Sequence, residues 1–226
     1  KPIMLCQLLA IAITNRSAIE VLEKIETDRV EAEAEGRTSL MAAVMGGHGE
    51  VVRALIDAGA DLNANAWDGV TALMLAASRN DAAAVFALVE AGATVGAQDR
   101  SRDTALVWAA AAGNRDSVAV LAGEPLGDQQ ADRALTEACL AGHSRVAEVL
   151  FDAEVSVDSV GREELTCLAL AAYRGNARTV TLALDRGAKV SAAGRGGFTA
   201  LMAAAATGRT EIIEQLLAGG ADPKRT

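Results

Sequence analysis

The stretch GVTALMLAASRN, residues 69–80, decides the fold, because close variants of it return along the chain. They are RDTALVWAAAAGN at residues 102–114 and GFTALMAAAATG at residues 197–208. The threonine in each string sets the interval. Thr38, Thr71 and Thr104 are 33 residues apart, and so are Thr166 and Thr199. A string that recurs at one fixed interval is typical of a structural repeat rather than of an active site.

Each repeat predicts two short helices. The threonine precedes an apolar, alanine-rich segment and can cap its first turn. A glycine or asparagine, such as Gly47, Asn80, Gly113 or Gly175, follows that segment and favours its end. A second apolar-periodic segment, as in EVVRALIDAG at residues 50–59, then closes on glycine before a polar, glycine-bearing turn. One repeat is therefore predicted to run turn, helix, turn, helix.

One repeat is shorter than the others. Arg133 takes the position of the threonine, and it lies 29 residues after Thr104 and 33 before Thr166. Pro125 falls where the second helix of that repeat should be ending. We therefore predict that its hairpin is absent, which leaves a break in the row of loops beside residues 123–131.

The strings GRTSLMAAVMGGHGEVVRALIDAGADLNA, residues 36–64, and DGVTALMLAASRNDAAAVFALVEAGATV, residues 68–95, resemble the ankyrin repeat. In that family the first helix opens with T-P-L-H and the second ends in G-A-D. The resemblance implies an all-α solenoid of stacked helix-turn-helix units with short hairpin loops. It implies one domain over residues 1–226, with an N-terminal cap over 1–34, repeats over 35–67, 68–100, 101–129 (shortened), 130–162 and 163–195, and a C-terminal cap over 196–226.

Composition and charge narrow the classes of partner. The chain has 226 residues, 51% of them apolar and only 3% aromatic, which favours closely packed helices with a core of Ala, Leu and Val. A formal net charge of −9 repels phosphate backbones, so we expect no nucleic-acid partner. Four of the 21 basic residues are lysines, a bias that favours a GC-rich, bacterial genome.

The three cysteines show no metal-site or disulfide pattern. Cys6, Cys139 and Cys167 are odd in number, widely separated and without C-x-x-C spacing, which indicates neither a disulfide framework nor a zinc site. Neighbouring repeats place alanine at the positions of Cys139 and Cys167, so we interpret both as small core residues. A reducing compartment is the simpler interpretation.

The apolar run IMLCQLLAIAI at residues 3–13 is too short to cross a bilayer, so no membrane partner is expected. Lys1 is not a start methionine, which suggests a trimmed or mature form. We expect a cytoplasmic protein, with a periplasmic or secreted location open if a leader was removed.

Histidines and buried aromatic residues receive structural roles. His48 and His143 occupy the same position of the repeat, after the glycine that ends the first helix, which favours a repeat-structural role over catalysis. Trp108 takes the place of a buried leucine of the family, and Phe86 and Phe151 lie on second helices. We predict that these three aromatic side chains belong to the core.

The resemblance also indicates which positions could bind. In ankyrin proteins the residues just before the threonine and at the end of the first helix line the concave surface. Val70 and Ser78 fall on such positions here. Arginines and exposed aromatic side chains are the usual anchors of an interface, and ordinary loop packing is the competing explanation. The predicted partner-binding residues are Trp67, Arg79, Arg100, Tyr173, Arg174 and Phe198.

The sequence thus predicts a non-enzymatic, monomeric module that binds another protein through its concave surface, without a cofactor, a metal or catalytic residues. One alternative is a bacterial inhibitor, an immunity protein or another accessory of an enzyme. Others are a fragment of a larger enzyme chain, a small-molecule or metal-binding protein, and an assembly that stacks end to end. The identity of the partner stays open.

Overall fold

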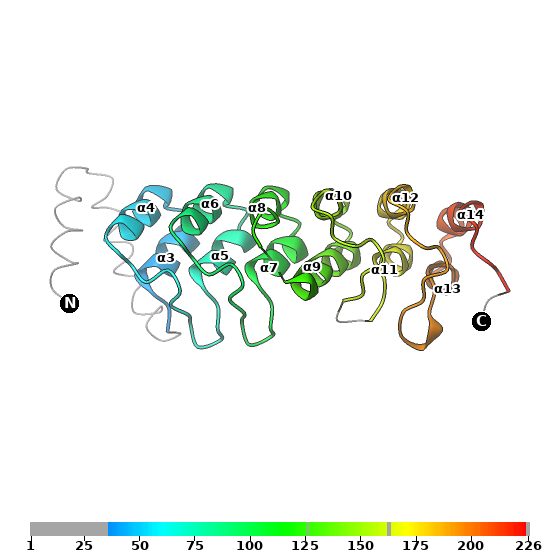
Figure 1. Ribbon diagram of the computed structural model, residues 1–226, viewed down its shortest axis with the longest axis horizontal. Helices are drawn as coiled ribbons and strands as arrows, with labels where there is room; N and C mark the ends of the chain where they lie inside the picture. Colours follow the sequence, from blue (N-terminus) through cyan, green and yellow to red (C-terminus); the bar gives the residue numbers. More distant parts are fainter. Residues whose placement is uncertain (1–35, 126, 162–163, 225–226) are drawn as a thin grey trace. The chain divides into compact units, whose positions relative to one another are not determined.

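The structure, a computed structural model, describes residues 36–125, 127–161 and 164–224. Over these residues the chain forms α-helices in consecutive pairs and no β-strand, which confirms the predicted all-α repeat fold (Figure 1). The predicted cap over 1–34 lies outside the described residues. The helices are α3 (Ser39–Gly46), α4 (Gly49–Asp57), α5 (Ala72–Ser78), α6 (Ala82–Glu90), α7 (Ala105–Ala112), α8 (Arg115–Leu121), α9 (Asp128–Ala141), α10 (Ser144–Asp152), α11 (Cys167–Arg174), α12 (Ala177–Asp185), α13 (Ala200–Ala206) and α14 (Thr210–Ala218), with a short 3-10 helix, η1 (Arg195–Gly197).

The helix boundaries follow the predicted capping residues. The hydroxyls of Thr38, Thr71, Thr166 and Thr199 each accept a hydrogen bond, 3.3 Å long, from the backbone N–H three residues later. This bond satisfies one of the N–H groups that a helix start leaves without a partner. The chain turns left-handed after the first helices, at Gly47 and Asn80 for example. The predicted starts and stops are confirmed at these positions.

The first helix of each pair is buried on nearly all sides, whereas the second buries one stripe. In α5, Leu73, Met74 and Ala77 are at most 2% exposed, and in α6 the buried side chains include Val85 and Leu88. Small alanines let the first helices approach closely, and each buried leucine contributes about 1.5–3 kcal/mol. This packing gives the repeats one continuous core within each compact part of the chain.

The helix packing divides the chain into two compact units, with the division in the sequence between Ala105 and Leu106. In the first compact unit, α3 packs on α4 and α5, and α6 packs on α4 and α5. In the second compact unit, α11 packs between α9 and α13, while α10 contacts α8, α9 and α12.

The predicted break in the row of loops is confirmed in the second compact unit. Three hairpins close with a backbone bridge, Asn65 to Thr71, Val160 to Thr166 and Ala193 to Thr199. The connection from α8 to α9 covers only residues 122–127, whereas those from α4 to α5 and from α6 to α7 cover residues 58–71 and 91–104. Helix α9 instead begins six residues before the start expected from the repeat. The position of the capping threonine is occupied by Arg133, whose side chain has no oxygen to accept an N–H bond, so the start of the helix is not fixed there.

The interpretation of the cysteines as unpaired core residues was wrong. Cys139 of α9 and Cys167 of α11 form a disulfide, with their Cα atoms 5.3 Å apart. Both side chains are fully buried, as predicted. The equivalent positions of other neighbouring repeats are also buried and hold alanine, as in the pair Ala172 and Ala200. Stacking therefore brings two small-residue positions, 28 residues apart in sequence, into direct contact.

Two of the three aromatic core predictions need correction. Phe151 is 8% exposed and belongs to the core, but Phe86 is 55% exposed and Trp108 is only partly buried. Phe86 follows the buried Val85 directly, so it projects about 100° away from the buried stripe of α6. The equivalent positions of other repeats hold polar residues such as Arg53, which is a signal that the sequence already contained.

Candidate functional site

In the first compact unit, two of the predicted binding residues lie on neighbouring hairpins. Trp67 is 65% exposed, yet one edge of its indole rests on the backbone of Gly36. A Cβ at Gly36 would fall 2.6 Å from Cδ1 of Trp67, so only glycine leaves room for the ring. The next hairpin is tied to this one because the N–H of Arg100 donates to the carbonyl of Asp68 over 2.9 Å. The side chain of Arg100 is exposed.

The third predicted residue of this unit, Arg79, lies at the other end of the first helix. It is the C-terminal cap of α5, while Trp67 precedes the start of α5. Its guanidinium reaches toward the preceding repeat, where a Cβ on Gly47 would lie 3.8 Å from Nη2. Val70, by contrast, is 6% exposed and belongs to the core, so it does not face solvent as expected.

In the second compact unit, Tyr173 and Arg174 end helix α11. Tyr173 is 48% exposed, and Arg174 is exposed as well. Nε of Arg174 donates a 2.6 Å hydrogen bond to the carbonyl of Leu140 in the last turn of α9. Phe198 precedes α13 and is half-buried, with its carbonyl accepting from the N–H of Gly194 in the hairpin. Tyr173 and Phe198 therefore come from opposite ends of adjacent first helices.

Arg174 belongs to a row of side chains that join successive repeats. Nε2 of His143 lies 3.1 Å from the carbonyl of Ala111, and Nδ2 of Asn176 donates to the carbonyl of Gly142 over 2.8 Å. These carbonyls end the preceding first helices, where the helix itself supplies no donor. His48 and His143 are both N-cap residues of second helices, which confirms their shared position. The bond of His143 supports its predicted structural role.

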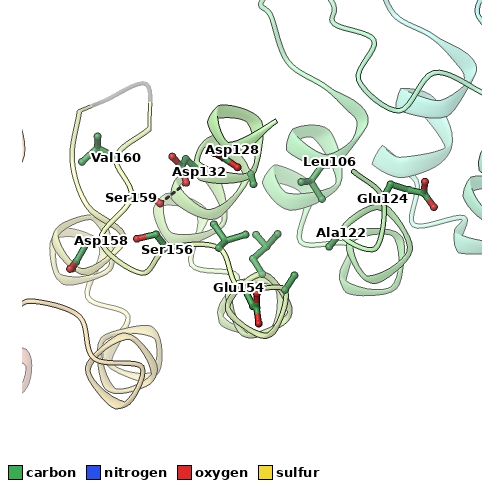
Figure 2. Close-up of a pocket in the computed structure, with 14 residues that line it drawn as sticks. Leu106, Ala122, Glu124, Asp128, Asp132, Glu154, Ser156, Asp158, Ser159 and Val160 are labelled. Atoms are coloured by element: carbon green, nitrogen blue, oxygen red, sulfur yellow. Dashed lines mark hydrogen bonds between the residues drawn. The ribbon is translucent and has the colours of Figure 1, made fainter. Parts of the chain in front are cut away.

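The structure also contains a groove that the sequence did not predict. A groove of about 590 Å³ opens beside the connection between α8 and α9, where the shortened repeat lacks its hairpin (Figure 2). Its apolar lining consists of Leu106, Leu150, Val155, Val160 and three alanines, of which the two leucines are fully buried. The break near residues 123–131 was predicted, but the depression was not, because it also needs the end of α10 and the loop that follows it.

Carboxylates surround this groove, and no lysine or arginine lines it among the described residues. They are Glu124, Asp128, Asp132, Glu154 and Asp158. In Figure 2 Asp128 and Asp132 lie together on the first turns of α9, and a dashed line joins Asp132 to Ser159, whose hydroxyl donates over 2.5 Å. Asp158 is already paired, because its Oδ2 lies 3.8 Å from Nζ of Lys189.

Within the described residues, no three His, Cys, Asp or Glu side chains are placed to hold a metal ion together. The same part of the chain contains no helix with the length and apolar character needed to span a membrane.

Comparison with known proteins places the chain among ankyrin repeat proteins. A family model of three ankyrin repeats matches residues 7–99, 73–161 and 135–226. The human ASB11 ankyrin repeat domain is 28% identical with a TM-score of 0.74, over 84% of this chain and 86% of that one. An ankyrin repeat domain from Acinetobacter baumannii AYE is 28% identical with a TM-score of 0.72, over 81% and 98%.

The ankyrin repeat domain of Bcl-3, of the IkappaB protein family, has a TM-score of 0.73 over 94% of this chain and 97% of that one. At 22% identity this likeness concerns the fold alone. No curated protein sequence gives a significant match. Because the family model matches nearly the whole chain, from residue 7 to residue 226, the protein belongs to the ankyrin repeat family.

Proposed function

We propose that this protein binds a partner protein through the exposed hairpin tips and first-helix ends of its repeats. Ankyrin repeats are in general protein–protein interaction modules. In the first compact unit the proposed contacts are Trp67, Arg79 and Arg100, and in the second they are Tyr173, Arg174 and Phe198. The identity of the partner follows from the experiment below rather than from the fold.

Trp67 is the single observation that carries the proposal. Only 3% of the residues are aromatic, and yet this indole is 65% exposed at a hairpin tip. Its contact with Gly36 holds the ring in place, so little side-chain entropy is lost when a partner covers it. Tryptophan and arginine are the residues that most often dominate the binding energy of an interface.

The six proposed contacts differ in how free they are to bind. Arg174 already donates to the carbonyl of Leu140, so its loss would disturb the repeat stack as well as a partner contact. Trp67, Arg100 and Tyr173 have exposed side chains and are the better probes of binding. Phe198 is half-buried, so its truncation would remove packing in the hairpin.

The test compares two matched double variants of the first compact unit. Trp67→Ala/Arg100→Ala changes the hairpin surface, whereas Phe86→Ala/Arg53→Ala removes an exposed aromatic residue and an arginine from the second helices. Wild type and both variants, with folding verified by circular dichroism, are used for affinity capture from an extract of the source organism. The captured partner is then purified and its dissociation constant is measured with each variant.

We expect the wild type and the second-helix variant to retain the same protein, and the hairpin variant to bind it at least about tenfold more weakly. Tyr173→Ala extends the comparison to the second compact unit, with the exposed Leu217→Ala as its control. If the hairpin variant and Tyr173→Ala bind as tightly as wild type while the second-helix variant does not, the proposed surface is wrong.

A further inference from the structure

The groove of the second compact unit has the size of a binding site. Its volume of about 590 Å³ falls in the range of known ligand pockets, roughly 300–1,000 Å³. Val155 and Val160, in the loop that follows α10, provide its accessible apolar surface, while Leu106 of α7 and Leu150 of α10 are fully buried beneath it. The disulfide between Cys139 and Cys167 closes the chain segment that contains α10 and the loop wall, which limits how far that wall can move.

The negative charge of the groove favours a positively charged ligand. Asp128 and Glu154 are exposed, and their carboxylates have no ion-pair or hydrogen-bond partner among the described residues of the chain. The C-terminal ends of α8 and α10 border the groove, and their carbonyl groups favour positive charge, whereas the N-terminus of α9 favours the carboxylate of Asp128. An apolar surface between carboxylates without an ion pair is complementary to an apolar side chain flanked by basic ones.

Glu154 supports a binding role because of its place in the repeat. It follows α10 in the left-handed conformation, with φ of 62°, where other repeats place Gly59, Gly92, Gly187 and Gly220, each also at positive φ. A residue with a Cβ is strained in this conformation, whereas glycine is not. The chain thus keeps a carboxylate beside the groove at the one position of the turn that glycine fits best.

We propose that this groove docks a segment of a partner protein in which a leucine-sized apolar residue is flanked by arginines. The apolar side chain lies on Val155 and Val160, and the guanidinium groups pair with Asp128 and Glu154. The site is separate from the six residues of the proposed interaction surface, so each of the two proposals can fail without the other.

The probe is a fluorescein-labelled peptide, Gly-Ser-Arg-Leu-Arg-Ser-Gly, titrated with the full chain while fluorescence anisotropy is followed. One control peptide carries glutamine in place of both arginines, and another carries serine in place of leucine. The protein variants are Glu154→Gly, Asp128→Asn/Glu154→Gly and Ala153→Trp, which fills the groove. Glu211→Gln/Glu214→Gln removes two exposed carboxylates from α14 in the same compact unit and serves as the charge-matched control.

We expect the arginine–leucine peptide to bind wild type and the α14 control alike, and to weaken as salt is added. Asp128→Asn/Glu154→Gly should raise the dissociation constant about tenfold, and Ala153→Trp should abolish saturation. Glu154→Gly should bind the peptide less tightly while melting at the same temperature as wild type or higher, because glycine relieves the left-handed conformation. If the role of Glu154 were only structural, Glu154→Gly would not weaken peptide binding while leaving the melting temperature unchanged or higher.

Several results would overturn the proposal. One is that the binding of the peptide to wild type does not saturate up to about 1 mM peptide. Another is that the glutamine peptide binds wild type as tightly as the arginine–leucine peptide. A third is that the dissociation constant is unchanged in the Asp128→Asn/Glu154→Gly or the Ala153→Trp variant. A last test uses calcium in place of the peptide. If calcium stabilises wild type against unfolding and also displaces the bound peptide, the groove is a cation site and the peptide proposal is wrong.

Discussion

Single side chains join one repeat to the next in the second compact unit. His143, Arg174 and Asn176 each reach a carbonyl at the end of the preceding first helix, and the disulfide crosses between the same row of helices. Such links act between nearest neighbours, which is where a repeat protein gains its stability. Arg79 occupies the same repeat position as Arg174 and also points toward its preceding repeat.

The disulfide gives a prediction about stability at this scale. We expect Cys139→Ala/Cys167→Ala to lower the free energy of unfolding by about 2–4 kcal/mol under oxidising conditions, because the unfolded chain loses a cross-link. Alanine fits these positions, since neighbouring repeats place it there. Urea unfolding measures the change. Dithiothreitol should destabilise wild type by a similar amount and leave the variant unchanged, and equal stability of the two proteins without reductant would contradict the prediction.

Each short first helix depends on the threonine that precedes it, because that residue caps the start of the helix. These helices have seven or eight residues where the threonine cap is present, which is too short for a stable helix in isolation. The threonine supplies a fixed start and the left-handed residue a fixed end, while burial of the helix supplies most of the stability. Helix α9 shows what happens without the cap. Arg133 replaces the threonine, and the helix is 14 residues long.

Removal of one cap should therefore have a measurable cost. We expect Thr71→Ala to lower the free energy of unfolding by about 1 kcal/mol, because the N–H of Met74 loses its acceptor in a buried setting. Thr71→Ser keeps the hydroxyl and should recover most of the loss. The comparison is made by urea denaturation of the three proteins. A Thr71→Ser variant as unstable as Thr71→Ala would assign the effect to packing of the methyl group instead.

At the scale of the whole molecule, the apolar core is alike in the two compact units, but the acidic side chains are not evenly spread. The core is uniform in kind, made of Ala, Leu and Val in both compact units, whereas carboxylates are concentrated around the groove of the second. The exposed apolar side chains in the first compact unit, such as Trp67 and Phe86, lie on different parts of the repeat. Neither arrangement favours association between identical chains, because a net charge of −9 makes copies repel.

We therefore expect a monomer in solution. Light scattering coupled to size exclusion should give a mass near 23.2 kDa that does not change with protein concentration. Added salt screens the repulsion, so the measurement is repeated at high ionic strength. A mass that rises with concentration would favour end-to-end stacking of copies, the alternative that the sequence left open.

Part of the candidate surface could be predicted from the repeat phase alone. Trp67, Arg100 and Tyr173 are exposed as expected, because their positions lie outside the helix segments that repeat packing constrains. Their role in binding stays a prediction. The acidic groove was missed because its walls come from α7, α8, α9, α10 and a loop. Glu154 could have been noticed, since it replaces a glycine that other repeats hold at the same position.

The sequence by itself determined the period, the helix caps, the family and the missing hairpin, because each of these depends on residues close together in the chain or at a fixed spacing. Only the tertiary structure decided the pairing of Cys139 with Cys167, the exposure of Phe86 and the groove beside Glu154. These features depend on which faces meet when repeats stack. Residues 28 positions apart come into contact only after two helices have packed, and no local pattern records that contact.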